Sequence, residues 1–203
     1  MTEDRPRRAA EFDAYYRDGT PPWDIGRPQA VFQALADGGA LTGAVLDVGC
    51  GTGEHALLAA GLGLAATGVD TSPTAIARAE GKVRDRGLTA RFVVADALEL
   101  AALGEVFDTV LDCGLFHVLS DAERPRFAAG LRAAMAPGGT YHLLCFSENE
   151  PGWGGPRRVT QRELRECFAE ADGWRFASIE PARLETTFAS GSAAAWHATI
   201  VRL

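Results

Sequence analysis

Apolar positions change their spacing in a regular way along the middle of the chain. Short apolar runs, typical of buried strands, alternate with longer stretches in which apolar residues recur every three or four positions, as on one face of a helix. The apolar runs cover residues 44–48, 65–69, 91–94, 107–111 and 141–146. Strands that alternate with helical stretches of about 10–15 residues predict βαβ units and a parallel sheet.

Residues at the ends of the helical stretches support this alternation. A helix is predicted over residues 54–60, directly after a glycine-rich turn. Ser72 can cap the next helix, with Pro73 suited to its first position and Gly87 just past its end. A third helix is predicted over about residues 120–135. Each lies between two predicted strands, as a crossover helix must.

The part of the chain before residue 44 follows another pattern. It predicts two short helices, over about residues 7–17 and 28–37. Between them lies a compact loop in which Trp23 is flanked by prolines and glycine. A tryptophan in a polar loop needs a surface to cover, either the protein core or a ligand.

The pattern changes again after residue 146. Residues 147–158 are rich in Gly, Pro and Glu and predict a long irregular loop, a kind of segment that is uncommon unless functional or disordered. Residues 160–163 form a capping-box signature for a helix that reaches about residue 170. Residues 174–179 and 195–203 then alternate like strands with no helix between them, which predicts an antiparallel pair at one edge of the sheet.

These elements together predict one α/β domain. The expected architecture is a doubly wound, mostly parallel sheet of seven strands, with an antiparallel C-terminal strand pair and helices on both faces. Residues 1–43, with two helices and the Trp loop, are expected to form a lid over residues 44–203, which carry the sheet.

Composition narrows the classes of partner. The chain has 203 residues, is 47% hydrophobic and carries a net charge of −7, which fits one globular domain and argues against nucleic acid as a partner. No apolar run approaches the roughly 20 residues of a membrane span, and the polar N-terminus is unlike a signal peptide. Four cysteines lie far apart, without metal or redox spacing. We expect a cytoplasmic protein that binds no metal.

The candidate binding feature is the turn that follows the first predicted strand. Glycines stand at alternate positions there, at Gly49, Gly51 and Gly53, just before a predicted helix. Glycine allows a tight turn and lets a ligand approach the backbone. The amides at the start of the helix, with the positive end of its dipole behind them, then face a bound group.

Acidic residues close three strands in succession: Asp70, Asp96 and Asp112. In an open parallel sheet, ligands bind outside the carboxyl ends of the strands. Asp70 lies 17 residues beyond Gly53, close to the ~20 expected of a carboxylate that binds ribose hydroxyls. The combination of glycine turn and acid predicts a cofactor that contains a nucleoside.

The spacing of the glycines bears on which cofactor it is. Counted from Gly49, the dinucleotide fingerprint Gly-x-Gly-x-x-Gly requires a third glycine where this chain has Glu54. Counted from Gly51, it requires one where the chain has Ala56. A carboxylate at Glu54 would also repel a pyrophosphate. An adenosine cofactor without phosphate therefore suits the turn better, although an NAD(P)-dependent reductase and a non-catalytic cofactor-binding module stay open as alternatives.

Residues 47–53, Asp-Val-Gly-Cys-Gly-Thr-Gly, resemble the first motif of class I S-adenosylmethionine-dependent methyltransferases, which have a Rossmann-like fold. Residues 68–70, 96–97 and 137–139 fall where that family has its ribose carboxylate, adenine-contacting turn and turn before the fifth strand. The resemblance implies that Asp47, Gly49 and Gly51 lie by the methionyl group, Asp70 by the ribose, and Asp96 and Ala97 by the adenine. Neighbouring residues complete the candidate cofactor site: Cys50, Gly53, Thr71 and Asp112.

A narrower resemblance comes from residues 21–28 and 111–117, which are similar to the thiopurine, thiol and tellurite-resistance branch of bacterial small-molecule methyltransferases. It implies that Trp23 closes over the cofactor. The expected reaction is methyl transfer to O, S or N of a small aromatic or heterocyclic acceptor, by a monomer or homodimer. The acceptor itself and the methylated atom stay open.

Aromatic residues gather in the segments that border the predicted cleft, which suits a flat apolar acceptor. The candidates for binding it are Tyr15, Tyr16, Phe116, Phe146 and Trp153. His117, just after the fourth predicted strand, is the candidate catalytic base for a phenolic acceptor. An imidazole that packs beside the cofactor or stabilises a loop is the alternative for His117.

Overall fold

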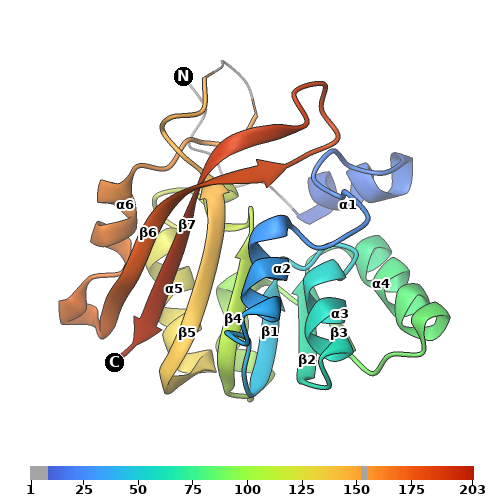
Figure 1. The fold of residues 1–203 in the computed structure, drawn as a ribbon, viewed down its shortest axis with the longest axis horizontal. Coiled ribbons are helices and arrows are strands. Elements are labelled where there is room, and N and C mark those ends of the chain that lie inside the picture. The colour runs from blue at the N-terminus through green and yellow to red at the C-terminus, as the bar shows by residue number, and fades with distance from the viewer. Residues whose placement is uncertain (1–8, 152–154) are drawn as a thin grey trace.

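Seven strands form one sheet in the computed structural model, which describes residues 9–151 and 155–203 (Figure 1). In chain order the strands are β1 (Ala44–Val48), β2 (Ala65–Asp70), β3 (Arg91–Val94), β4 (Phe107–Cys113), β5 (Met135–Phe146), β6 (Trp174–Glu185) and β7 (Ser192–Arg202). Across the sheet they lie in the order β3-β2-β1-β4-β5-β7-β6. This arrangement confirms the predicted doubly wound α/β fold.

The strand order reverses between β1 and β4, which lie side by side in the middle of the sheet and run parallel to each other. One βα path leads from β1 to β2 and β3, and the other leads outward from β4 to β5. Since the two paths diverge here, the loops beyond the carboxyl ends of β1 and β4 leave a crevice between them. The fold therefore places the glycine turn and residues 112–117 on the two sides of one crevice.

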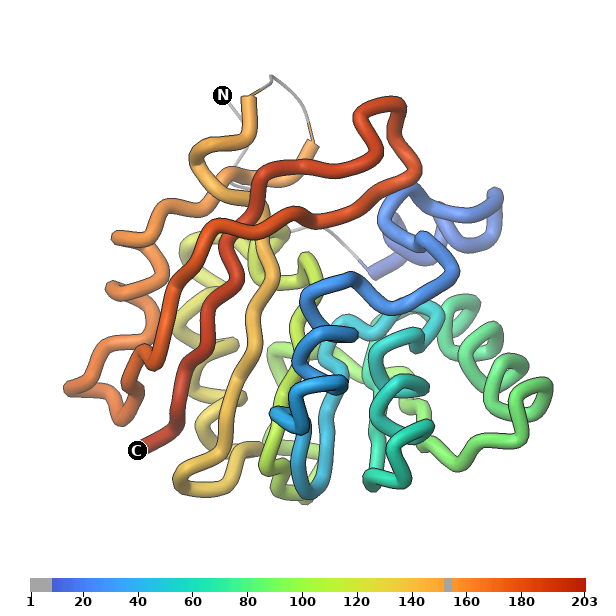
Figure 2. Tube along the Cα trace, viewed as in Figure 1, coloured from blue at the N-terminus to red at the C-terminus, as the bar shows by residue number. Residues whose placement is uncertain are grey.

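The last two strands confirm the predicted antiparallel pair and extend it. β7 pairs antiparallel with β5 and with β6, so the C-terminal strand lies inside the sheet and β6 forms the edge. β6 runs to Glu185 and β7 begins at Ser192, well beyond the predicted ends. The extra length forms a hairpin that projects past the sheet towards the N-terminal segment (Figure 2).

Helices cover both faces of the sheet. The α-helices are α1 (Ala9–Asp18), α2 (Ala30–Asp37), α3 (Glu54–Gly61), α4 (Pro73–Arg86), α5 (Arg124–Ala134) and α6 (Gln161–Cys167). The 3₁₀ helices are η1 (Ala97–Leu103), η2 (Phe116–Val118) and η3 (Glu170–Asp172). The helices α2, α3 and α4 contribute to one hydrophobic core, and η1, α5 and α6 contribute to the other.

Side-chain alternation along the strands separates these two cores. Leu46 and Val110 point into the core under α5, whereas Val45 and Leu111, next to them in sequence, point into the core under α2 and α3. Each strand of the central sheet is therefore buried on both faces, as the continuous apolar runs predict.

Helix caps follow the predicted residues in two places. The Ser72 hydroxyl accepts the amide of Ala75 at 3.0 Å, and α4 ends at Arg86 before Gly87. Thr160 and Glu163 form the predicted capping box of α6, although that helix ends at Cys167, three residues early. The helix predicted from Pro28 begins instead at Ala30, because Gln29 stands at its N-cap in an extended conformation.

The N-terminal segment divides into two parts. Phe32 of α2 is fully buried in the same core as α3, so α2 belongs to the packed domain. Residues 9–28, which we call the lid, lie beside α4 and the C-terminal hairpin (Figures 1 and 2). The Thr187 amide donates to the Pro22 carbonyl at 2.8 Å and thereby ties the hairpin to the lid. Within the described ranges, no helix has the length and apolarity needed to cross a membrane.

Candidate active site

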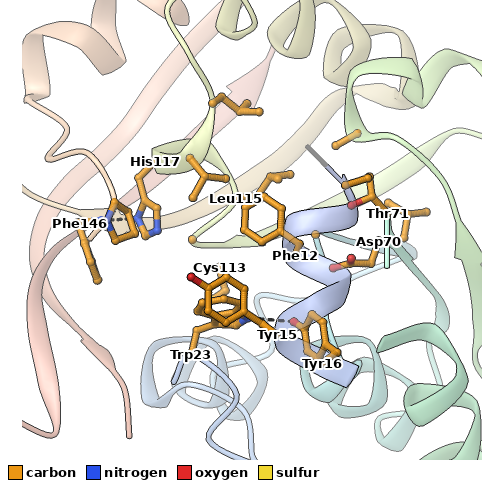
Figure 3. Close-up of a pocket in the computed structure, with 18 of the residues that line it drawn as sticks. Phe12, Tyr15, Tyr16, Trp23, Asp70, Thr71, Cys113, Leu115, His117 and Phe146 are labelled. Atoms are coloured by element: carbon orange, nitrogen blue, oxygen red, sulfur yellow. Dashed lines mark hydrogen bonds between the residues drawn. The ribbon is translucent and has the colours of Figure 1, made fainter. Parts of the chain in front are cut away.

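A cavity of about 550 Å³ lies at the crevice between β1 and β4. Its wall combines the ends of β1, β2 and β4 with the lid, η2, Phe146 and the tip of the C-terminal hairpin. In Figure 3, Asp70 and Thr71 lie at one side of the cavity and His117 and Phe146 at the other. We call these sides the acidic wall (Asp70, Thr71, Asp96, Ala97 and Leu98) and the aromatic wall (Tyr15, Trp23, His117, Phe146 and Phe188).

The acidic wall is built from strand ends and backbone amides. The Asp70 carboxylate accepts the amide of Gly51 at 2.8 Å through Oδ2 and the amide of Ser72 at 2.8 Å through Oδ1. Burial raises the pKa of Asp70, and the bonds from Ser72 and Gly51 offset this only in part. Asp70 therefore holds the glycine turn against β2 while it faces the cavity.

Asp96 extends the acidic wall along the next strand. Its Oδ1 accepts the amide of Leu98 at 2.9 Å and caps η1. Ala97, buried behind it, adds an apolar edge to the same wall. A carboxylate beside an apolar slot suits ribose hydroxyls and a flat base, so this wall has the composition expected for a nucleoside.

Gly51 shows what the glycine turn makes room for. A Cβ at this position would stand 2.6 Å from the hydroxyl oxygen of Tyr16, and Gly51 has a φ of +51°. Glycine is therefore required for the lid to close onto the turn. Gly49 lines the cavity at the start of the turn, and a Cβ there would stand 2.9 Å from the Cβ of Leu115, which lines the same cavity.

The lid carries a cluster of aromatic rings. Trp23 contacts Phe12, Tyr15 and Tyr16 edge to face, at centroid distances of 6.2, 5.0 and 6.3 Å. Its indole Nε1 donates to the Tyr16 hydroxyl at 2.9 Å. Burial raises the pKa of Tyr16, so its phenol stays neutral. The cluster therefore gives the cavity a fixed aromatic cover.

Asp13 fixes the lid to the start of α4. Its Oδ1 accepts the Ser72 hydroxyl at 2.7 Å and the Thr74 amide at 3.1 Å. These two bonds lower the pKa of Asp13, and the N-terminal end of the helix dipole favours its charge as well. Arg78 adds bonds to the carbonyls of Tyr16 and Gly19. The lid is thus held by the same helix that follows Asp70.

His117 lines the aromatic wall with one ring nitrogen committed to the backbone. Its Nδ1 accepts the amide of Phe146 at 3.0 Å, and the two rings pack with centroids 4.5 Å apart. The position of His117 in η2 and its contacts with Phe146 at the end of β5 thus set the orientation of the ring. A neutral imidazole whose Nδ1 accepts a hydrogen bond carries its own proton on Nε2.

The structure moves one predicted acceptor residue into the core. Phe116 has no exposed surface and packs against Phe127 and Phe168, with the Arg124 guanidinium 4.6 Å from its ring centroid. It does not line the cavity, because η2 turns its side chain under α5. We therefore withdraw Phe116 from the acceptor-binding residues. Another predicted acceptor residue, Trp153, lies outside the described residues.

Other residues predicted to bind the cofactor do not line the cavity and instead support the segments that do. Asp47 accepts the amide of Ala56 at 3.0 Å at the start of α3. Asp112 accepts the Tyr141 hydroxyl at 2.8 Å and the Leu115 amide at 2.9 Å, and burial raises its pKa to about 7. The residues of this kind, which do not appear on the cavity wall, are Asp47, Cys50, Gly51, Gly53 and Asp112.

Glu54 does not play the part that its position predicts. It is 6% exposed, does not line the cavity, and forms ion pairs with Lys82 at 2.7 Å and Arg86 at 2.8 Å. Burial raises the pKa of Glu54, but the bonds from Arg86 and Lys82 outweigh it and leave the pKa below its usual value. Its charge is neutralised by α4, so repulsion of a pyrophosphate by Glu54 is not a valid argument against a dinucleotide.

Several residues of the cavity wall were missed by sequence reasoning. Phe12 shares a helix face with Tyr15 and Tyr16, and that periodicity could have identified it. Six further residues of the wall are placed by the ends of β4 and β6, by η2 and its N-cap and by the hairpin, for which the sequence held no usable signal: Cys113, Leu115, Val118, Leu184, Thr186 and Phe188. In the described ranges, no group of three or more His, Cys, Asp or Glu side chains could hold a metal ion.

Comparisons with known proteins agree with this geometry. Residues 45–139 match the family described as "Methyltransferase domain". The chain is 39% identical to the 2-heptyl-1-hydroxyquinolin-4(1H)-one methyltransferase of Mycobacteroides abscessus, over 81% of this chain and 73% of that protein. It is 30% identical to a probable thiol methyltransferase of Arabidopsis thaliana, over 74% of this chain and 67% of that protein.

A solved structure extends the likeness to nearly the whole fold. It comes from work on the conversion of a disulfide bond into a thioacetal group during echinomycin biosynthesis, and it superposes with a TM-score of 0.86. The two chains are 40% identical, and the match covers 96% of this chain and 93% of that one. Of the three classes that the sequence leaves open, these relatives support one: the chain belongs to the class I S-adenosylmethionine-dependent methyltransferases.

Proposed function

We propose that this methyltransferase transfers the methyl group of S-adenosylmethionine to an O, S or N atom of a flat, small aromatic or heterocyclic molecule. One observation carries the proposal: a single cavity joins the acidic wall to the aromatic wall. The first wall suits a nucleoside, and the second suits an apolar ring with few polar contacts.

In this proposal the acidic wall holds the cofactor. Asp70 and Thr71 bind the ribose, Asp96 and Ala97 border the adenine, and Gly49 lies next to the methionyl group. Trp23 closes over the cofactor from the lid. When bound, the cofactor supplies a methyl group on a positively charged sulfur, which the acceptor attacks in line.

The aromatic wall then orients the acceptor. Tyr15, Trp23 and Phe146 provide apolar surface, and Leu184 and Phe188 extend it from the hairpin. Correct alignment of an attacking atom with the methyl group can supply much of the acceleration. The lid and the hairpin, which are joined by the hydrogen bond between Thr187 and Pro22, both contribute to this part of the wall.

The names of the relatives support this acceptor class. One acts on a hydroxyquinolinone, a flat heterocycle with an acidic oxygen, and another is named for thiols. We also propose that the protein is cytoplasmic, which is supported by the free state of all four of its cysteines. We also propose that the protein acts as a monomer or a homodimer.

The proposal is tested by binding and turnover on the same preparation. Calorimetry should show binding of S-adenosylmethionine and S-adenosylhomocysteine and no binding of NAD. Mass spectrometry of reactions with 1-hydroxyquinolin-4(1H)-one, thiophenol and a quinoline should show a gain of one methyl group in at least one acceptor. Binding without turnover across such a panel would contradict the proposed acceptor class.

A further inference from the structure

Gln29, at the start of α2, is joined by its side chain to the last residue of β6. Its Nε2 donates to the Glu185 carbonyl at 3.0 Å, and its Oε1 accepts the Glu185 amide at 2.8 Å. Gln29 is only 1% exposed. Because β6 is the edge strand, this carboxamide bonds to its main chain much as a further strand would.

The residues on either side of Glu185 belong to the cavity wall, whereas Glu185 and Gln29 do not line it. Successive side chains of a strand point to opposite faces, so Leu184 and Thr186 share a face and shift together with Glu185. Phe188 lines the same cavity from the turn of the hairpin. We call Leu184, Thr186 and Phe188 the hairpin wall.

Two other contacts also hold the hairpin. Arg27 donates to both carboxylate oxygens of Glu185, at 3.0 and 2.7 Å, but its side chain is 57% exposed, so solvent screens the pair. The Thr187 amide donates a single bond to the Pro22 carbonyl of the lid. Two hydrogen bonds from the buried Gln29 side chain therefore hold the hairpin more firmly than either of these contacts.

Gln29 is itself fixed to the helix that follows the glycine turn. Its main-chain amide donates to Nε2 of His55 at 3.2 Å, and the His55 ring packs on Phe32 with centroids 4.5 Å apart. The neutral His55 ring then has its proton on Nδ1, which lies 3.8 Å from Oδ1 of Asp47. Gln29 thus holds the hairpin at a set place relative to the glycine turn.

We infer that Gln29 is a positioning residue for methyl transfer, which acts through Glu185 to hold the hairpin wall against the acceptor. This inference rests on the proposed function and adds to it a residue outside the cavity. When the hairpin wall is displaced for part of the time, only the remaining fraction of molecules binds the acceptor well, and KM rises by the inverse of that fraction. The acidic wall takes no part in these contacts, so cofactor affinity should stay as it is.

The first test compares Gln29→Met with the matched control Thr109→Val. Met has about the length of Gln and keeps the amide for His55, but it cannot bond to Glu185. Thr109 is also 1% exposed, does not line the cavity, and bonds through its hydroxyl to the amide and carbonyl of Thr42, at 3.2 and 2.9 Å. Each variant thus loses two hydrogen bonds to the main chain of one residue.

The expected result is a change in KM that the control does not share. With 1-hydroxyquinolin-4(1H)-one and thiophenol as acceptors, Gln29→Met should raise KM about 5- to 30-fold and keep kcat within about twofold. Calorimetry should show unchanged affinity for S-adenosylhomocysteine. A loss of folded enzyme would instead lower kcat and leave KM as it is. An unchanged KM in Gln29→Met, or an equal rise in Thr109→Val, would overturn the inference.

A second variant covers the case in which Gln29→Met does not fold. Serine at position 29 is too short to reach Glu185, but Gln29 is the N-cap of α2, where serine is a favoured residue. Gln29→Ser should therefore keep the helix start while it releases the hairpin, and the same rise in KM is expected.

A double variant asks whether Gln29 acts through the hairpin wall. Phe188 is 57% exposed, so Phe188→Ala should leave the fold intact. The rise in KM for Gln29→Met combined with Phe188→Ala should be smaller than the product of the two single rises, because both changes act on the same wall. Rises that multiply would contradict action through the hairpin.

Hydrogen exchange separates this inference from the function on which it rests. The amides of residues 184–192 should exchange faster in Gln29→Met than in the wild type, and at the wild-type rate in Thr109→Val. Unchanged exchange in the hairpin would overturn the inference even where turnover is normal. Faster exchange in Gln29→Met, without turnover of any acceptor by the wild type, would overturn the proposed function while Gln29 still holds the hairpin.

Discussion

The two walls of the cavity are built by different means. In the acidic wall, backbone amides next to the strand ends fix the two carboxylates: Asp70 accepts the amides of Gly51 and Ser72, and Asp96 accepts that of Leu98. The aromatic wall instead assembles from four segments far apart in sequence: the lid, η2, the end of β5 and the hairpin. It depends on packing between these segments and on a few hydrogen bonds such as that between Trp23 and Tyr16.

This difference indicates which wall tolerates substitution and which does not. The acidic wall is fixed by the parallel ladder, whose register sets where each strand ends. The aromatic wall rests on loops that can lengthen or exchange side chains without moving the sheet. We therefore expect substitutions in the first wall to affect the cofactor and substitutions in the second to affect the acceptor.

Substitution of Phe116 is expected to have the largest effect on stability, and it tests whether this residue belongs to the core or to the aromatic wall. Because it is fully buried, Phe116→Ala should lower the free energy of unfolding by about 3–5 kcal/mol, measured by chemical denaturation. The milder Phe116→Leu should leave KM for the acceptor unchanged. The matched variant Phe146→Leu, on the cavity wall, should raise that KM. Equal rises in KM for both Leu variants would show that Phe116 takes part in binding the acceptor.

The strands beneath the aromatic wall carry an acid-sensitive pair. His142 of β5, 3% exposed, stacks on His197 of β7 with centroids 5.7 Å apart. Burial lowers the pKa of His142 from 6.5 to about 4, with a contribution from His197. Between these values the unfolded chain binds a proton that the folded chain does not, so stability falls as pH falls, by about 3 kcal/mol in all.

Urea unfolding at several pH values measures this loss. We expect the free energy of unfolding to fall as the pH is lowered from 6.5 towards 4, and His142→Leu to flatten that slope. Hydrogen exchange at pH 5 should show the first losses of protection in β5, β6 and β7 rather than in β1 and β2. A slope that is unchanged in His142→Leu would contradict the assignment of the acid sensitivity to this pair.

Asp70 tests the acidic wall. Asp70→Ala removes a carboxylate in position for charge-assisted bonds to ribose hydroxyls, so cofactor binding should weaken by about 1.5–3 kcal/mol, or about 10- to 150-fold. Calorimetry with S-adenosylhomocysteine measures the change. Asp108→Ala is the matched control, because Asp108 also accepts an amide, that of Ala44 at 2.8 Å, and does not line the cavity. Equal losses in both variants would show a folding defect rather than a lost contact.

The acidic wall could be predicted from the sequence because its signals are local. A short apolar run, glycines at alternate positions and an acid at the end of the next strand are close in sequence and lie close in space. Asp70, Asp96 and Ala97 accordingly line the cavity. Even here the local sequence does not show where a side chain points. Glu54 points away from the cavity, towards Lys82 and Arg86 of another helix.

The aromatic wall could be predicted only in part, because nonlocal packing decides which side chains reach it. Phe116 and His117 are neighbours in sequence, yet η2 sends the first into the core and the second to the cavity. Phe188 comes to the wall because the C-terminal hairpin extends beyond the sheet, and no residue pattern indicated that extension. The tautomer of His117 depends on the Phe146 amide, a contact that spans 29 residues.

The hydrogen bond between Trp23 and Tyr16 gives the smallest expected effect and asks whether the lid acts as one unit. The bond is 2.9 Å long and joins the Trp loop to α1, where Tyr16 also meets Gly51 of the turn. Trp23→Phe and Tyr16→Phe each remove it while keeping an aromatic ring. A double-mutant cycle on acceptor KM and on cofactor affinity should give a coupling of about 1 kcal/mol in the first and less in the second. Coupling confined to cofactor affinity would show that Trp23 and Tyr16 act on the cofactor alone, and would contradict the proposed part of Trp23 in binding the acceptor.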